Sequence, residues 1–194
     1  MTFYHNGQRT LQRQFDSTAL ADRLEQVTHR TRLTDDDCRF IEASSCFFLA
    51  TADVEGRPDC SYKGGQPGFV QAPEPDLIVF PDYDGNGMFR SLGNVSVNPA
   101  VGMLFIRMDG SPKRLRINGR ADVRLDDPLM ASFPGAIALV RVIPEHIFPN
   151  CPRYVHDLVN GAPSPFTPMA DQEPLEPAWK SFDSFRDVVP PRKR

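Results

Sequence analysis

The chain has 194 residues and a formal net charge of −3, so it is long enough for one domain with its own hydrophobic core and carries no large basic field. Nucleic acid is therefore not expected as its main partner. Its four cysteines form no C-x-x-C pair, which argues against a structural zinc site and against a secreted disulfide framework.

The N-terminal part, about residues 1–45, is expected to be helical. It lacks the apolar core of a signal peptide, and no stretch approaches the roughly 18 apolar residues of a membrane span, so we expect a soluble, cytoplasmic protein. Leu20, Leu24 and Val27 recur at helical spacing. Thr34 followed by aspartates at 35–37 is typical of an N-cap with acidic residues in the first turn. A metal site at these aspartates is the alternative, although no second cluster of ligands follows.

About six strands are expected after this helical part. The apolar run at residues 46–51 predicts a strand buried on both faces, followed by a turn and a partner strand at residues 58–63. Because hairpin-length turns join most strands and helices lie at the periphery, we expect a small antiparallel barrel, which leaves few exposed edges. Further strand segments are expected at residues 69–71, 77–81, 101–106, 113–123 and 136–143.

The chain is organised around residues 80–99. The end of a buried strand leads into a Gly-rich polar loop, residues 82–87, and then into a short helix that stops at Asn98 and Pro99. Loop glycines let the backbone approach a ligand closely, and free N–H groups at a helix N-terminus favour a phosphate. Lys63, at the end of an earlier strand, can supply a positive charge to the same group. An ordinary surface turn is the alternative, because such turns are also rich in Gly, Asn and Asp.

Three arginines, Arg114, Arg116 and Arg120, share one face of the strand expected at residues 113–123. Three positive charges on one strand face favour anionic neighbours. Either this face is solvated or paired with acidic side chains, or Arg114 or Arg116 reaches the ligand of the central stretch.

From about residue 144 to residue 194 the chain is expected to form an extended, Pro-rich segment. Cys151 and His156 lie close together in this segment, and a nucleophile with its base is one interpretation of the pair. No third orienting residue or oxyanion motif can be placed, however. The catalytic residues therefore stay unknown.

Six motifs follow one another in order. They are Asp53-x-x-Gly56-Arg57-Pro58, Ser61-Tyr62-Lys63-Gly64-Gly65, Phe80-Pro81-Asp82-Tyr83-x-Gly85-Asn86, Leu92-Gly93-Asn94, Asn98-Pro99-x-Val101-Gly102-x-Leu104-Phe105-Ile106 and Arg114-Leu115-Arg116-Ile117-x-Gly119. Together, from about Phe40 to Ile143, they resemble the pyridoxamine 5'-phosphate oxidase-related family of FMN-binding split barrels. The resemblance implies a single domain, residues 1–194, that is mainly β with peripheral helices and forms a six-stranded antiparallel split β-barrel.

The resemblance also implies that FMN is the cofactor. The positions that match the family's cofactor contacts are Ser61, Tyr62, Lys63, Pro81, Asp82, Asn86 and Met88, with Arg114 and Arg116 as further contacts. Relatives carry a segment similar to Asn150-Cys151-Pro152-Arg153 near the flavin, so Arg153 is expected to contact the substrate or the cofactor. This chain has Gly87 and Met88 where the oxidases of the family carry a basic pair. The phosphate is therefore expected to be held by fewer charges, and oxidation of a phosphorylated vitamin B6 substrate is not implied.

The expected function is hydride or electron transfer through bound FMN, with an unknown small-molecule substrate. A homodimer with flavin sites near its interface is implied by the resemblance. The alternative is a non-catalytic flavin- or haem-binding protein, a carrier or sensor on the same barrel. His146 and His156 are the late histidines that could serve a haem iron, and no other metal site is expected.

Overall fold

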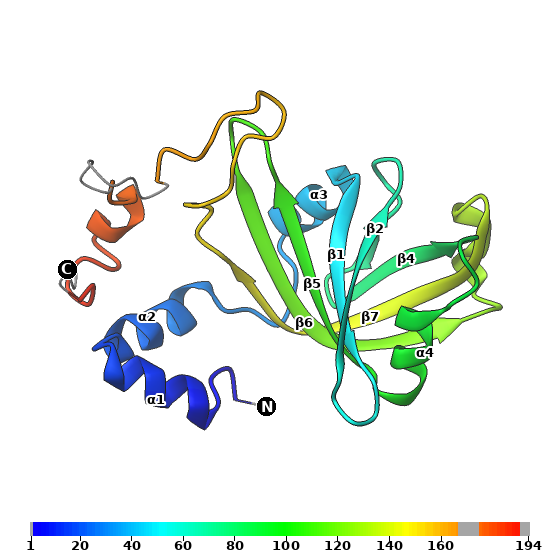
Figure 1. Ribbon diagram of the computed structural model, residues 1–194, viewed down its shortest axis with the longest axis horizontal. Coiled ribbons are helices and arrows are strands. Elements are labelled where there is room, and N and C mark those ends of the chain that lie inside the picture. Colours follow the sequence, from blue (N-terminus) through cyan, green and yellow to red (C-terminus); the bar gives the residue numbers. More distant parts are fainter. Residues whose placement is uncertain (1, 167–174, 191–194) are drawn as a thin grey trace. The chain divides into compact units, whose positions relative to one another are not determined.

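The computed structural model describes residues 2–166 and 175–190 (Figure 1). These residues fall into two compact units. The larger unit consists of Arg30–Arg107 and Lys113–Asn150, and the smaller unit takes its residues from Met1–His29, Met108–Pro112 and Cys151–Arg194. Residues 167–174, which belong to the expected Pro-rich segment, lie outside the described residues.

The larger unit is built on one antiparallel sheet, with helices α3 (Asp35–Ala43) and α4 (Arg90–Val97) outside it (Figure 1). The strands run across the sheet in the order β2-β1-β5-β6-β7-β4-β3, and each pairing is antiparallel. The expected mainly β architecture with peripheral helices is therefore confirmed. In the described part of the chain the strands are β1 (Cys46–Ala52), β2 (Pro58–Gly64), β3 (Gln71–Glu74), β4 (Leu77–Tyr83), β5 (Ala100–Arg107), β6 (Lys113–Arg124) and β7 (Ala136–Pro149).

Two strands differ from the sequence prediction. Across the described residues the sheet has seven strands, one more than the six-stranded barrel that the resemblance implies, and the short β3 begins where the segment expected at residues 69–71 ends. β7 continues past Ile143 to Pro149, so Pro144 does not end the strand. Pro144 lies opposite Gly119, where the register between β6 and β7 shifts, and a proline is tolerated at such an irregularity. His146 therefore lies in β7 and not in an extended C-terminal segment.

Aromatic rings fill the centre of the larger unit. The ring centroids of Phe47 and Phe105 lie 5.0 Å apart, and Phe80 meets Phe47 edge to face at the same separation. All three side chains are buried in the main hydrophobic cluster. Val79, the neighbour of Phe80, belongs to a second cluster with Leu139. β4 is therefore buried on both faces and forms a firm support for the residues that follow it.

The N-terminus of α3 has the predicted cap. Thr34 Oγ1 accepts a hydrogen bond from the Asp37 N–H at 3.2 Å, and Asp37 Oδ2 accepts one from the Thr34 N–H at 3.0 Å. Arg30 Nη2 donates to both carboxylate oxygens of Asp37 at 2.9 and 2.8 Å. The aspartates thus start a helix, and the described residues contain no group of three or more His, Cys, Asp or Glu side chains that could hold a metal ion.

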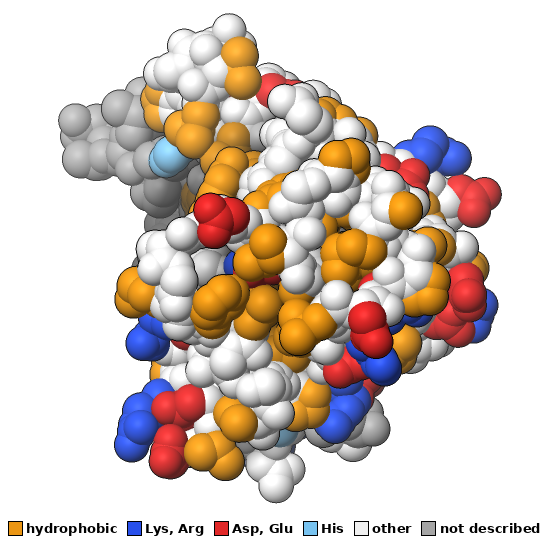
Figure 2. All heavy atoms as spheres, turned by 90° about the vertical axis from the view of Figure 1, so that its right-hand side faces the viewer, with side chains coloured by type: hydrophobic (Ala, Val, Ile, Leu, Met, Phe, Trp, Pro, Cys, Tyr) orange, Lys and Arg blue, Asp and Glu red, His pale blue; other side chains and the backbone are white. Residues whose placement is uncertain are grey.

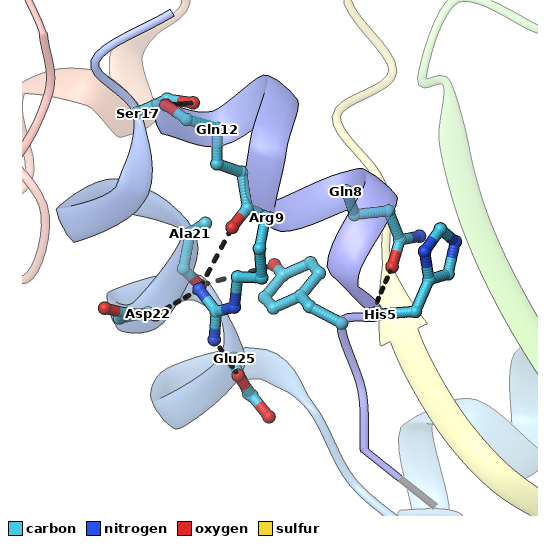
Figure 3. Close-up of polar contacts among 9 residues, drawn as sticks. His5, Gln8, Arg9, Gln12, Ser17, Ala21, Asp22 and Glu25 are labelled. Carbon is cyan, nitrogen blue, oxygen red and sulfur yellow. Dashed lines mark hydrogen bonds and ion pairs between the residues drawn. The ribbon is translucent and has the colours of Figure 1, made fainter. Parts of the chain in front are cut away.

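In the smaller unit, α1 (Asn6–Gln14) packs beside α2 (Thr18–Thr28), and Figure 3 shows the polar contacts between them. Arg9 on α1 donates to Asp22 Oδ1 at 2.5 Å and to Glu25 Oε2 at 3.4 Å, both on α2. These contacts hold the two helices together. Within the described residues, no helix combines the length and the apolar character needed to cross a membrane.

The start of α1 is capped by a histidine. The His5 Nδ1 atom accepts a hydrogen bond from the Gly7 N–H at 3.1 Å. Gln8 Oε1 accepts one from the His5 N–H at 2.9 Å, which Figure 3 shows. Because the usual N-cap residues are Ser, Thr, Asp and Asn, this start is difficult to find in the sequence.

Candidate functional site

A pocket of about 460 Å³ lies in the larger unit between β2, the loop that follows β4 and the first turn of α4. The structure thus brings Lys63 and the Gly-rich loop to the same place. Cofactor binding there stays a prediction. Six of the residues predicted to contact the cofactor line the pocket, namely Ser61, Tyr62, Lys63, Asp82, Asn86 and Met88.

Two side chains of β2 hold the first turn of α4. Asp59 Oδ1 accepts a hydrogen bond from Arg90 Nε at 3.2 Å, and the hydroxyl oxygens of Ser61 and Ser91 lie 3.0 Å apart. Because Asp59 and Ser61 are two positions apart, they lie on the same face of the strand. The helix start is therefore held against the wall of the pocket from which Lys63 also comes.

Lys63 and Asp82 form an ion pair across the pocket. Lys63 Nζ donates to Asp82 Oδ1 at 2.9 Å, and the two side chains are only 18% and 13% exposed. In the strand order, β1, β5, β6 and β7 separate β2 from β4. The sheet must therefore curl until β2, at one edge, approaches β4, next to the other edge, and this ion pair joins the two strands.

The position of Asp82 follows from an irregularity at the end of β4. The pairing of β4 with β7 shifts register between Asp82 and Tyr83, and such a bulge changes the direction of a side chain next to it. Pro81, just before it, is buried in β4 and does not line the pocket. The expected contact of Pro81 with the cofactor stays a prediction.

The loop before α4 takes a left-handed backbone conformation twice. Gly87 has a φ of 71° and Phe89 a φ of 47°, and the second value is uncommon for a residue with a side chain. Met88 N–H donates to Asn86 Oδ1 at 3.0 Å, so this N–H group is already used within the loop. Phe89 provides no side-chain cap for α4, and the N–H groups of its first turn have no partner within the helix.

The direction of α4 is fixed by its C-terminal half. Asn94 Nδ2 donates to Thr51 Oγ1 at 3.0 Å, and Asn98 Nδ2 donates to the Asp53 carbonyl oxygen at 3.2 Å. Both acceptors belong to the β1–β2 hairpin or its turn. The hairpin therefore holds α4 at both ends, and its N-terminus stays directed at the pocket.

The rim of the pocket is apolar and exposed. Tyr62 and Met88 are each 63% exposed, and Phe89 is 54% exposed. A hydrogen bond with the Cys46 thiol raises the pKa of Tyr62, so its hydroxyl is protonated at neutral pH. Exposed apolar side chains around a polar floor suit a planar aromatic ligand that carries a charged end.

Arg114 and Arg116 lie beside the main pocket rather than in it. Together with Phe48 and Leu104 they line a second hollow of about 280 Å³ on the outward face of the sheet. Cys60 lines both hollows. The two arginines are thus neighbours of the candidate site, and the Arg116 guanidinium lies 5.4 Å from the centroid of the Phe148 ring.

Arg153 belongs to the smaller unit. Its guanidinium lies 5.0 Å from the centroid of the Tyr154 ring, and its carbonyl oxygen accepts a hydrogen bond from Ser164 Oγ at 2.5 Å. His156 Nδ1 accepts the Ser164 N–H at 2.9 Å. The expected contact of Arg153 with substrate or cofactor, and haem ligation by His146 or His156, stay predictions.

A sequence profile of the pyridoxamine 5'-phosphate oxidase family matches residues 33–147, which is more than half of the chain. The chain belongs to this family. The matched part extends from just before α3 into β7. It therefore contains the whole lining of the 460 Å³ pocket.

A solved structure gives the same fold. A candidate pyridoxamine 5'-phosphate oxidase from Lactobacillus delbrueckii is 18% identical, and the match covers 63% of this chain and 99% of that one with a TM-score of 0.50. This likeness shows the fold alone, and it confirms the split barrel expected from the sequence. No curated protein matches the chain.

Two further matches have lower scores. A variant of HupZ from Group A Streptococcus is 13% identical, covers 61% of this chain and 99% of its own and has a TM-score of 0.49. HutZ, named as the heme storage protein from Vibrio cholerae, is 25% identical, with 61% and 95% of the two chains covered and a TM-score of 0.43.

Several residues of the pocket were missed by the sequence analysis. Asp59, Arg90 and Ser91 line it, and all three contact another wall. Ser91 has a signal in the sequence, because it lies in the first turn of a helix that follows a Gly-rich loop. No signal in the sequence indicates the contact between Asp59 and Arg90, because the two residues are 31 positions apart in the chain.

Proposed function

We propose that the 460 Å³ pocket binds FMN and that the chain is an FMN-dependent oxidoreductase whose substrate is a small molecule. The observation that supports this most is the common position of Ser61, Lys63 and the first turn of α4 around one pocket. Membership of the pyridoxamine 5'-phosphate oxidase family supports FMN over other phosphate-bearing ligands.

The phosphate would be held at the N-terminus of α4. First-turn N–H groups and the positive end of the helix dipole favour an anion, and the hydroxyls of Ser61 and Ser91 lie beside them. Lys63 adds an ammonium group, the one that lines this pocket among the described residues. Gly87 and Met88 add no charge, so we expect weaker phosphate binding than a site with a basic pair would give.

The ring would lie against the apolar rim. Tyr62, Met88 and Phe89 are exposed there, and they would exclude water from one face of a planar ligand. Bound FMN would supply hydride or electron transfer. No side chain of the described residues is assigned as a general acid or base.

A homodimer with flavin sites near its interface is part of the proposal. The apolar rim continues toward the second hollow, where Phe48 and Leu104 lie on the outward face of the sheet. A second copy on this face would bury both the rim and the hollow, and it would bring Arg114 and Arg116 close to the interface. Sedimentation or light scattering of the purified chain tests this part by itself.

The test of FMN binding is a titration. We expect the purified chain to show flavin absorption or to quench the fluorescence of added FMN, whereas a Soret band would favour a haem carrier. Lys63→Gln should weaken FMN binding by about 1.5 to 3 kcal/mol if the ammonium pairs with the phosphate. Lys113→Gln is the matched control, because Lys113 lies over the Phe40 ring and does not line the pocket.

Turnover needs a separate test. Bound FMN in an anaerobic sample should be bleached by NADH or NADPH if the chain accepts a hydride from a nicotinamide donor. Failure with both donors, together with tight FMN binding, would move the function to a non-catalytic flavin carrier or sensor.

A further inference from the structure

The charges that line the pocket are already paired with one another. Lys63 forms an ion pair with Asp82, and Arg90 forms one with Asp59. The charges of these two cations and two carboxylates therefore neutralise one another. On the face of the molecule that Figure 2 shows, most acidic side chains likewise lie next to basic ones. Among the described residues, a phosphate dianion that enters the pocket therefore meets no cation of the lining without a carboxylate partner.

The two pairs differ in how strongly they hold. The Arg90 and Asp59 side chains are 63% and 20% exposed, whereas those of Lys63 and Asp82 are 18% and 13% exposed. Water screens the first pair far more than the second. Asp82 is therefore the carboxylate that competes most strongly with a phosphate for a cation of this pocket.

We infer that Asp82 and the phosphate of the ligand exchange places on Lys63, so that Asp82 sets the phosphate affinity and the phosphate selectivity of the site. This inference rests on the proposed function. In the free chain the Asp82 carboxylate pairs with the Lys63 ammonium in the pocket. Without this partner, the ammonium would be an unpaired charge in a largely buried position. On binding, the phosphate takes the ammonium, and the Asp82 carboxylate remains nearby as a like charge.

Asp82 lies at the end of the regular pairing of β4, in the lining of the pocket. The pairing of β4 with β7 is regular as far as Asp82 and then shifts register, and Tyr83 beyond the shift is 38% exposed. The side chain thus sits where the rigid part of β4 ends. A rotation of the carboxylate away from Lys63 needs no change in the buried residues before it.

The inference is tested with Asp82→Asn. This variant keeps the shape of the side chain and removes its charge, so we expect it to bind FMN about tenfold more tightly, because a like charge close to the phosphate is lost. Riboflavin, which has the same ring and no phosphate, should change by less than about twofold. Asp76→Asn is the control. The Asp76 carboxylate pairs with Arg32 at a distance of 2.6 Å, and Asp76 does not line this pocket.

The same substitution in a Lys63→Gln variant distinguishes two explanations for tighter binding. One is competition of the carboxylate for the Lys63 ammonium, and the other is simple repulsion between the carboxylate and the phosphate. If the carboxylate competes for the ammonium, Asp82→Asn should gain much less FMN affinity in the Lys63→Gln background than in the natural chain. Asp82→Ser serves as a second neutral variant in case Asp82→Asn does not fold, and circular dichroism establishes which variants are folded.

The outcomes are distinct. Unchanged or weaker FMN binding by folded Asp82→Asn or Asp82→Ser, while the natural chain binds FMN, would overturn the exchange and leave the proposed function standing. An equal gain from Asp76→Asn, or an equal gain for riboflavin, would also overturn it. If neither the natural chain nor any variant binds FMN or riboflavin, both the inference and the proposed function fail.

Discussion

The ion pair between Lys63 and Asp82 can be tested without any ligand by a double-mutant cycle on stability. The variants are Lys63→Met, Asp82→Asn and the double variant. Because the side chains are 18% and 13% exposed, removal of one partner leaves the other charge largely out of water. Loss of one member of a fully buried pair costs about 3 to 5 kcal/mol, so we expect about 2 kcal/mol for each single variant of this partly exposed pair.

The double variant should be destabilised by less than the sum of the two single variants. We expect a coupling energy of about 1 to 2 kcal/mol, from urea unfolding followed by circular dichroism. The control cycle uses Arg32 and Asp76, which are 2.6 Å apart but 62% and 43% exposed, and should give less than about 1 kcal/mol. Additive effects of Lys63→Met and Asp82→Asn, within about 0.5 kcal/mol, would refute the ion pair and with it the joining of β2 to β4.

The other predictions concern stability. Asp127→Ala should cost about 2 to 4 kcal/mol in chemical unfolding, because its carboxylate is 2% exposed and accepts hydrogen bonds from Arg141 at 2.5 and 2.9 Å. Those hydrogen bonds lower the pKa of Asp127 from 3.8. The contribution of Asp127 to the free energy of unfolding should therefore be complete at neutral pH and be lost as the pH falls below about 4. A melting temperature that falls equally in the natural chain and in Asp127→Ala over this range would contradict the prediction. Gly119→Ala should destabilise by about 1 to 3 kcal/mol, because its Cβ would lie 2.3 Å from the Ile143 carbonyl oxygen, whereas Gly93→Ala in α4, with nothing within 4 Å of the new Cβ, should be neutral or stabilising by up to about 1 kcal/mol.

Local signals in the sequence were enough for several elements. Thr34 and the aspartates after it predicted the start of α3, because capping depends on residues three apart in the chain. The break at Asn98 and Pro99 predicted the end of α4 in the same way. Runs of apolar residues predicted the strands around Phe47 and Phe105. The expectation that residues 46–51 are buried on both faces is wrong, because burial alternates along β1 with a period of two residues.

Elements that depend on distant partners were predicted less well. Pro144 suggested the end of a strand, but β7 continues because Gly119 on β6 leaves space opposite it. α1 was not recognised as a separate helix, since its cap is His5, and its Leu11 and Phe15 are exposed rather than buried in a core.

For the candidate site, the sequence predicted which segments meet and not how their charges are arranged. The pattern of the Gly-rich loop, the helix start and Lys63 predicted one site for these segments, and they line one pocket. The ion pair of Lys63 with Asp82 joins residues 19 positions apart on strands that are not neighbours in the sheet. Such a contact depends on the curl of the whole sheet, and no local pattern reports it.

The central claim is that the pocket between β2 and α4 binds FMN by its phosphate. Its most direct test is a fluorescence titration of the purified natural chain with FMN and, separately, with riboflavin. We expect saturable binding of FMN that is at least about tenfold tighter than binding of riboflavin. Equal affinity for the two flavins, or no binding of either, would contradict it.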